Sequence, residues 1–181
     1  MSPTPTPRPS SLQELERLRQ EMLHTEYTTP DTFAGCSTEE IQQVVDAASP
    51  IQLPDEYIAY LQLFGRGSGT LFRGSNICYP APLESRESAE DIASDPEETL
   101  TLENRFFFGD HQGYTVYFFE QGSDAVFGYA EGHPEVLRLA ETFTQWLWET
   151  FRRSQAIRAD SERLRAETAK KRAQMRAEGK L

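Results

Sequence analysis

Cysteine, histidine and long apolar runs are scarce in this 181-residue sequence, and each shortage excludes a class of protein. The two cysteines, Cys36 and Cys78, cannot form a disulfide framework, and with three scattered histidines they do not make a zinc-binding pattern. No apolar run approaches the length of a transmembrane helix, and the first residues lack the basic and apolar segments of a secretory signal. We therefore expect a cytosolic protein with reduced, partly buried thiols and without a metal or cofactor.

Positive charge is also scarce, except near the C-terminal end. The formal net charge is −11, but ten of the 18 Lys and Arg residues, and only four of the 29 Asp and Glu residues, lie from Arg152 onward. Residues 1–151 therefore carry −17 and residues 152–181 carry +6. An acidic body repels nucleic acid and anionic membranes and attracts basic proteins, although acidic residues also serve solubility alone. The basic end lacks interleaved aromatic residues, so we predict neither sequence-specific nucleic-acid binding nor membrane binding.

The change of composition along the chain predicts one domain with two extensions. Residues 1–10 alternate proline with small polar residues and arginine, which predicts a disordered leader. Residues 11–151 contain all of the aromatic residues and are expected to form a single domain. Residues 152–181 are rich in helix-forming residues but poor in large apolar ones, which are Ile157, Leu164 and Met175 before the final Leu181. We expect a solvated, partly helical extension there, with pairing to another chain or contact with the acidic body as alternatives.

Two serine residues mark the starts of helices in the N-terminal part of the chain. Ser11 with Glu14 and Ser37 with Glu40 have the spacing of a capping box, and apolar residues on one helical face follow each pair. The second helix is expected over residues 38–48. The first is expected to be short and to pack on the body or on another chain.

Three alternating glycines in the stretch LFGRGSGTLF follow a third expected helix, which begins at Pro54 and reaches Gly65. Glycine runs of this kind often bind phosphate, but a phosphate loop precedes a helix, and the Gly-Lys-Ser/Thr ending is missing here. We therefore predict that Gly65 is a left-handed helix cap, and that Gly67 and Gly69 reverse the chain into a short strand. Arg66 between them is a candidate contact residue.

Aromatic-rich strands dominate the second half of the domain. The stretches RFFFG, YTVYFFEQG and AVFGYAEG are separated by short turns, which predicts an antiparallel meander. TLFRG and NICYPA are expected as shorter strands before it, and a helix capped by Thr142 is expected to close the domain. Between these groups, residues 83–104 form the most acidic segment of the chain. We expect an exposed loop there, with at most a helical turn from Ser88 to Ala93.

The order of these motifs resembles the SUKH superfamily, which groups yeast cell-wall-assembly regulators with many bacterial immunity proteins. The resemblance covers about residues 38–151 and rests on a Leu-Pro-x-x-Tyr helix with a glycine turn, a Gly-Asp-x-x-Gly hairpin and a closing Thr-Phe helix. The matching positions are Leu53, Pro54, Tyr57, Gly65, Gly67, Gly109, Asp110, Gly113, Thr142, Phe143 and Leu147. The resemblance implies an α+β fold with a mostly antiparallel sheet and packed helices. It also implies protein binding rather than catalysis.

Residues with catalytic potential have simpler interpretations. Asp110 and His111 lie between two expected strands, where aspartate stabilises a tight turn through backbone contacts. Cys78 lies in a short apolar stretch and His133 in a Gly-His-Pro turn, and no third residue that would orient a Cys-His pair is recognisable nearby. The crowded acids of residues 90–98 lack the alternating ligands and the central glycine of a calcium loop. We therefore predict that the protein is not an enzyme.

A protein-binding surface is the remaining interpretation. We expect an immunity protein that neutralises a cognate toxin, such as a nuclease or another enzyme, because an acidic inhibitor attracts a basic nuclease. The alternative is a regulatory or scaffold module of the same superfamily that recruits a cellular protein. The candidate contacts are acids before the strand-rich region and two turn residues, namely Glu84, Glu87, Glu90, Asp91, Asp95, Glu97, Glu98, Asp110 and Arg66. The sequence makes no prediction of the oligomeric state.

Overall fold

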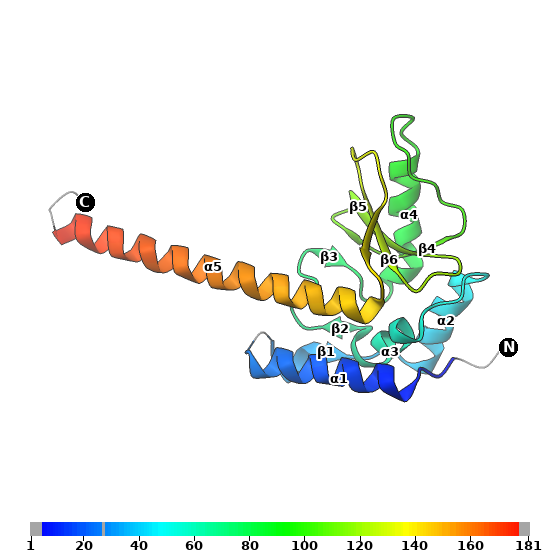
Figure 1. Ribbon diagram of the computed structural model, residues 1–181, viewed down its shortest axis with the longest axis horizontal. Coiled ribbons are helices and arrows are strands. Elements are labelled where there is room, and N and C mark those ends of the chain that lie inside the picture. Colours follow the sequence, from blue (N-terminus) through cyan, green and yellow to red (C-terminus); the bar gives the residue numbers. More distant parts are fainter. Residues whose placement is uncertain (1–4, 27, 178–181) are drawn as a thin grey trace.

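The computed structural model describes residues 5–26 and 28–177 and has the α+β architecture expected from the sequence (Figure 1). Its α-helices in these ranges are α1 (Pro9–His24), α2 (Thr38–Ala48), α3 (Asp55–Phe64), α4 (Ala81–Ala93) and α5 (Phe143–Ala177). Helices α1, α2 and α3 share one apolar core with the start of α5, and α4 lies against the sheet in a separate cluster. The rest of α5 projects far beyond the body (Figure 1).

The main sheet is antiparallel, with strands in the order β3-β4-β5-β6-β7. These strands are β3 (Ser75–Asn76), β4 (Arg105–His111), β5 (Thr115–Glu120), β6 (Val126–Ala130) and β7 (Leu137–Ala140). The pairing of β4 with β5 and of β5 with β6 confirms the meander predicted from the aromatic stretches. The sequence did not indicate β7, because four residues are too few to establish a period of two.

The core has two parts because neighbouring strand residues point to opposite faces of the sheet. On one face, the ring of Tyr57 from α3 packs against Phe108, Phe119 and Phe143, with centroid distances of 5.0–5.4 Å. On the other face, residues of β4, β5 and β6 form a separate apolar cluster with Ala89 and Ile92 of α4. The sheet is therefore held between two layers of helix, and α4 is part of the folded body.

Residues 83–104 are not mainly an exposed loop, contrary to the expectation from their composition. Helix α4 begins at Ala81 and covers the first half of this segment. Its inner face is formed by Ala81, Ser85, Ala89 and Ile92, which are buried. Small side chains let a helix approach a sheet closely, but they contribute little to an apolar pattern along the sequence. This is why composition alone pointed to a loop.

Gly65 is not a left-handed cap, because its φ of −61° lies in the right-handed region. A Cβ atom at this position would lie 2.5 Å from the carbonyl oxygen of Leu61 and would also meet the sulfur of Cys36. Close packing therefore explains the glycine. The left-handed conformation occurs instead at Gly69, whose φ is 66°.

The short strands around this glycine joint also differ from the expectation. Gly67 and Ser68 form β2 (Gly67–Ser68), which pairs with β1 (Phe33–Ala34) in a small second sheet. The stretch TLFRG forms turns, and of NICYPA only the first residue belongs to a strand. The predicted strand positions here were wrong because pairing partners distant in the sequence determine which residues become a strand.

Helix α1 begins three residues earlier than its predicted capping box implied. Its N-terminal residue is Pro9, and no side chain caps it, so the capping box predicted from Ser11 and Glu14 is not formed. Three apolar residues of α1 are fully buried, and the helix packs on α3 and α5. Of the two alternatives for this helix, packing on the body is the one observed. Of the predicted leader, residues 1–10, Pro9 and Ser10 belong to α1, and residues 1–4 lie outside the described residues.

Helix α5 joins the closing helix of the domain and the basic extension in one element. The Thr142 hydroxyl accepts a hydrogen bond from the Gln145 amide at 3.2 Å, which confirms the predicted cap. The helix then continues to Ala177 without a break at Arg152. No helix within the described ranges combines the length and the apolar character needed to cross a bilayer.

Candidate protein-binding surface

The outer side of α4 carries four exposed carboxylates, which we call the acidic face: Glu84, Glu87, Glu90 and Asp91. These residues face outward because the opposite side of the helix is buried against the sheet. Within the helix, Arg86 donates to Glu90 at 2.9 Å, and the other three acids form no ion pair with the residues that the structure describes. The fold thus places four of the predicted contact residues on one rigid, solvent-exposed element.

The acids that follow α4 divide into exposed and structural residues. Asp95 and Glu97 are exposed, and a carboxylate oxygen of Asp95 accepts the Glu97 amide at 2.9 Å. Glu98 differs, because it accepts hydrogen bonds from the Tyr129 hydroxyl at 2.5 Å and from the Gly132 amide at 2.7 Å. Glu98 therefore connects the acidic turn that follows α4 to the end of β6. Its carboxylate already accepts hydrogen bonds within the molecule.

Asp110 is buried, with 6% of its surface exposed, so the expectation of an exposed residue in this turn was wrong. Its Oδ1 accepts the Gly113 amide at 3.0 Å, and Asn76 donates to Oδ2 at 3.4 Å. The interpretation of Asp110 as a residue that stabilises the hairpin turn agrees with these contacts. His111 beside it shares a 2.9 Å hydrogen bond with the hydroxyl of Ser75 on the neighbouring strand.

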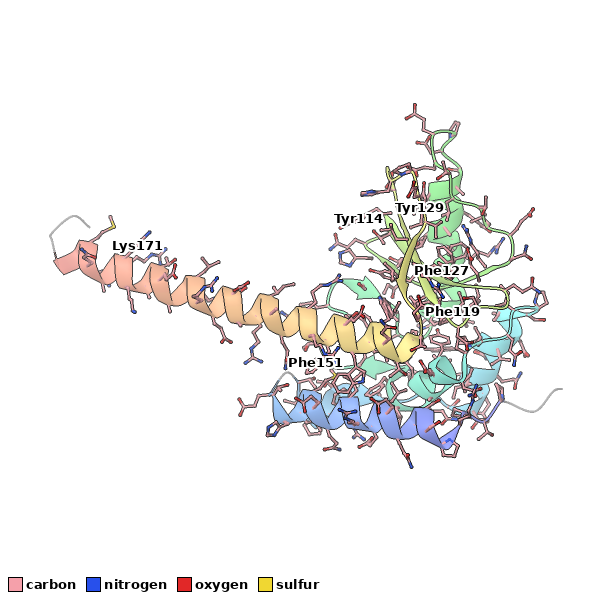
Figure 2. All side chains as sticks on the ribbon, viewed as in Figure 1. Tyr114, Phe119, Phe127, Tyr129, Phe151 and Lys171 are labelled. Atoms are coloured by element: carbon pink, nitrogen blue, oxygen red, sulfur yellow. The ribbon has the colours of Figure 1, made fainter. Side chains whose placement is uncertain are left out.

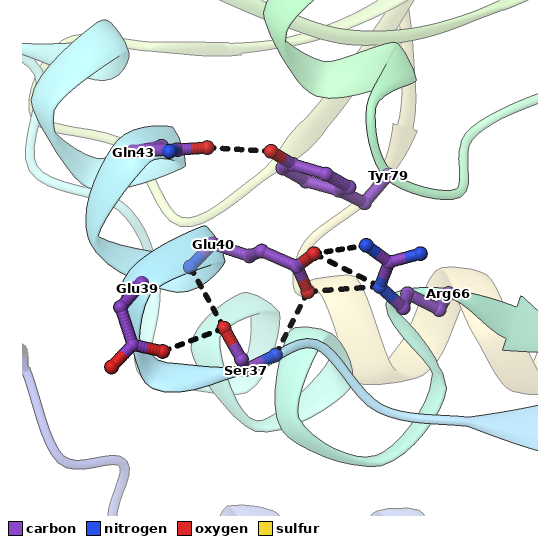
Figure 3. A network of polar contacts seen from close by, with 6 residues as sticks. All are labelled: Ser37, Glu39, Glu40, Gln43, Arg66 and Tyr79. Carbon is purple, nitrogen blue, oxygen red and sulfur yellow. Dashed lines mark hydrogen bonds and ion pairs between the residues drawn. The ribbon is translucent and has the colours of Figure 1, made fainter.

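Arg66 belongs to a polar network at the N-terminal end of α2 (Figure 3). Its Nε donates to both carboxylate oxygens of Glu40 at 2.9 and 3.0 Å, and its Nη2 also contacts Glu40. Glu40 accepts the Ser37 amide at 2.9 Å in the capping box that the sequence predicted. The hydrogen bonds from Arg66 and from the Ser37 amide lower the pKa of Glu40 from 4.5 to about 2.

The same network reaches the chain segment just before α4. The guanidinium of Arg66 lies 5.3 Å from the centre of the Tyr79 ring, and the Tyr79 hydroxyl donates to Gln43 at 2.5 Å. The Tyr79 amide also donates to the carbonyl of Gly65 at 2.7 Å. Arg66 therefore joins α2, the glycine joint and the start of α4, which makes it a positioning residue for the acidic face.

A hollow of about 490 Å³ lies beside the acidic face, and we call it the α4 hollow. Its apolar lining includes Ile51 from the α2–α3 connection, Leu83 from α4 and Leu102 before β4. Arg86 and Arg105 also line it, and each is paired with a glutamate. Sequence reasoning missed this hollow, because its walls come from three segments far apart in the chain.

Cys78 and His133, which were considered for catalysis, and the second cysteine, Cys36, take part in structural contacts. Cys36 is a free, half-buried thiol whose pKa is raised to about 12, chiefly by burial and then by the nearby Glu40. Cys78 is also free and half-buried, as expected, and its sulfur lies 3.8 Å from the hydroxyl of Ser68. The amide of His133 donates to the Ala130 carbonyl at 3.0 Å in the turn after β6. A thiol with a raised pKa is a poor nucleophile at neutral pH.

Comparison with known proteins agrees with the order of motifs in the sequence. A comparison with curated proteins gave no match. The model of the SMI1 / KNR4 family (SUKH-1) matches residues 35–149, which is more than half of the chain and includes α2, α3, α4 and the whole main sheet. Helix α1 and most of α5 lie outside the match. The chain therefore belongs to the SMI1 / KNR4 family (SUKH-1).

Proposed function

We propose that this protein is an immunity protein of the cytoplasm that binds a toxin protein and blocks it without chemistry of its own. Its family supports a protein-binding role, since the SUKH superfamily includes many bacterial immunity proteins. The observation specific to this chain is the acidic face, where four carboxylates stand on one exposed side of a helix that the sheet holds rigidly. Rigid elements position contact residues more accurately than loops do.

The partner that this surface fits best is a basic enzyme such as a nuclease. Carboxylates on α4 raise the rate of encounter with a positively charged surface, because long-range attraction steers the two proteins together. The α4 hollow beside them would receive an apolar or aromatic side chain of the toxin, since buried anchors supply most of the affinity in protein interfaces. The acids then determine the association rate, and the hollow determines how long the complex lasts.

Co-expression with a toxin encoded beside this gene tests the proposal. We expect growth to be rescued, and we expect the purified proteins to form a complex of fixed stoichiometry without turnover of the toxin. Absence of a complex with every toxin encoded nearby would refute the proposal.

Point substitutions test the role of the acidic face, because deletion of α4 would remove part of the core. The variant Glu84→Gln, Glu87→Gln, Asp91→Asn should associate with the toxin at least about tenfold more slowly at low salt. The matched control neutralises three exposed acids on α1, its following turn and α5, namely Glu21→Gln, Glu26→Gln and Glu167→Gln. An equal slowing in both variants would assign the effect to net charge and not to the acidic face.

A regulatory or scaffold module is the second candidate function. The observation in its favour is the part of α5 beyond Arg152, which projects from the body and lies outside the family match (Figure 1). A recruiting role for α1 has less support, because the apolar side of that helix is buried in the body. Stable association with cellular complexes, in a genome without a toxin gene nearby, would favour this function over immunity.

A further inference from the structure

The projecting part of α5, residues 152–177, has a face that is basic and apolar at once. We call these residues the α5 extension. The face that packs on the body through Phe143, Leu147 and Phe151 continues outward in steps of three and four residues. We call its continuation the inner face, and its residues are Ser154, Ile157, Arg158, Ser161, Leu164, Arg165, Thr168, Arg172, Met175 and Arg176. This face holds four arginines and three large apolar residues and contains no acid.

The acids of the α5 extension lie elsewhere on the helix. Asp160 and Glu167 lie on one flank of the helix, and Glu162 on the other flank is paired with Arg158 at 3.0 Å. Ile157 is 61% exposed and Leu164 59% exposed, which is unusual for large aliphatic residues on a charged helix. The inner face thus combines arginines and exposed apolar residues without an acid, which indicates a surface that binds an acidic partner.

A hollow of about 690 Å³ lies where the α5 extension leaves the body. Leu71 and Arg73 line it from the turns after β2, and Ile157 and Arg165 line it from α5. Arg158 also donates to the Glu26 carbonyl at 3.1 Å, which fixes the root of the extension against the turn after α1. Figure 2 shows Lys171 on the part of α5 that lies well away from the body. The inner face therefore begins at this hollow and continues outward along α5 (Figure 1).

Two nearby occupants of the inner face are disfavoured by geometry and charge. A continuous helix that points away from the body cannot bring its inner face onto the acidic face of the same molecule (Figure 1). Pairing of two α5 extensions would bring two helices of net charge +6 together, which is repulsive. An acidic helix with an exposed apolar residue, on another molecule, would be attracted to the arginines of the inner face and could pack on its apolar residues.

The acidic face of α4 is such a helix. Leu83 is 37% exposed and lies one helical turn before Glu87 on the same side of α4. Arginine binds carboxylates with two parallel hydrogen bonds, so the arginines of the inner face can pair with the acids of α4 while Leu164 packs on Leu83. At about 1.5 Å per residue, the α5 extension is about 39 Å long and α4 about 20 Å, so one extension can span the whole of α4.

We propose that the inner face of the α5 extension binds the acidic face of α4 in a second copy of this chain, so that the protein self-associates. A basic toxin would compete for the same acidic face. The proposal does not depend on such a toxin, because self-association is measured with the purified protein alone. Arg165 and Arg172 lie far from α4 of their own molecule, so substitutions there separate self-association from toxin binding.

Sedimentation velocity of the full chain, at several concentrations and at low and high salt, tests this proposal. The wild-type protein should associate with increasing concentration, and salt at about 1 M should weaken the association because it shortens the Debye length. The variant Arg165→Glu, Arg172→Glu should raise the dissociation constant at least about tenfold. The matched control Arg163→Glu, Lys170→Glu makes the same charge change on the opposite side and should retain most of the association. Circular dichroism verifies that both variants keep the helix.

A charge exchange identifies the partner surface. The variant Glu87→Arg, Asp91→Arg should not self-associate, and mixing it with Arg165→Glu, Arg172→Glu should restore association between the two chains. Failure of the mixture to associate would overturn the proposal, as would a wild-type protein that stays monomeric. A monomeric protein that binds poly(U) or vesicles of phosphatidylserine and phosphatidylcholine through Arg165 and Arg172 would assign the inner face to nucleic acid or membrane instead.

Discussion

The body and the α5 extension of this chain are stabilised by different kinds of interaction. The body buries its aromatic residues between helices and sheet, and even its acidic helix α4 packs a buried face. The α5 extension buries almost nothing, and its order rests on helix-forming residues and on ion pairs three or four residues apart, such as Arg158 with Glu162. Charge follows the same division, with −17 before Arg152 and +6 from there on. The body is therefore held by tertiary contacts, whereas the extension is available for contacts with other molecules.

The largest expected effect compares one buried and one exposed side chain. Phe108→Ala should lower the free energy of unfolding by about 3–5 kcal/mol, because the ring packs on Tyr57, Phe119 and Phe143. Leu164→Ala in the α5 extension should change it by less than about 0.5 kcal/mol. Urea unfolding at high salt and low protein concentration measures both without self-association. Comparable losses would mean that the extension is part of the cooperative body.

A smaller loss is expected when the acidic turn is released from the sheet. Tyr129→Phe removes the hydroxyl that donates to Glu98 and accepts the Thr99 amide, and it should cost about 1–3 kcal/mol. Tyr114→Phe is the matched control, since its hydroxyl is at an exposed site and donates only a 3.2 Å bond to Gln112. The control should cost less than about 0.5 kcal/mol in the same measurement. A loss no larger than in the control would mean that Glu98 does not fasten the turn.

A local effect is expected from glycine in the α5 extension. Ala166→Gly should destabilise the helix by about 0.5–1 kcal/mol around this position, because glycine loses more backbone entropy than alanine. Hydrogen exchange of amides near residue 166 should accelerate, while amides of the main sheet keep their protection. Faster exchange in the sheet as well would contradict the separation of the two regions.

The smallest effect concerns the network around Arg66 and depends on pH. The pKa of Glu40 is lowered from 4.5 to about 2, so its contribution to stability is present above pH 4.5 and is lost as the pH falls toward 2. Arg66→Met should make the protein less stable at neutral pH and reduce the loss of stability between these two pH values. Thermal unfolding across this pH window measures the difference. An unchanged slope would show that Arg66 does not hold Glu40 in its charged form.

Elements with strong local signals were predicted well from the sequence. The capping box of Ser37 and Glu40 placed α2 at its observed bounds, and the aromatic stretches indicated the strands of the meander. These signals are local because capping and strand alternation involve residues close in sequence. Helix α4 was not recognised, since its inner face is made of alanine and serine and its outer face is acidic. Only the sheet beneath it makes those small residues a packing surface.

The candidate site shows the same limit at the level of single residues. Glu84, Glu87 and Glu98 looked equivalent in the sequence, yet two lie on the exposed face of α4 and the third is held by Tyr129 and Gly132. Asp110 proved to be buried near the end of β4, where its carboxylate accepts the Gly113 amide of the turn. No local pattern distinguishes Glu98 from the other acids, because its partners Tyr129 and Gly132 lie more than 30 residues away in the chain.

The sequence by itself determined the family, the α+β class, the acidic body with its basic end, and the local starts of α2 and α5. Periodicity, capping and charge depend on residues that are close in the sequence, so these signals can be recognised without knowing the fold. Only the tertiary structure decided that the acidic segment contains a packed helix, that Gly65 is required by contact with Leu61 and Cys36, and that Ile157 and Leu164 of the α5 extension stay exposed. Each of these depends on which segments, far apart in the sequence, pack against each other, because that packing decides which side chains are buried.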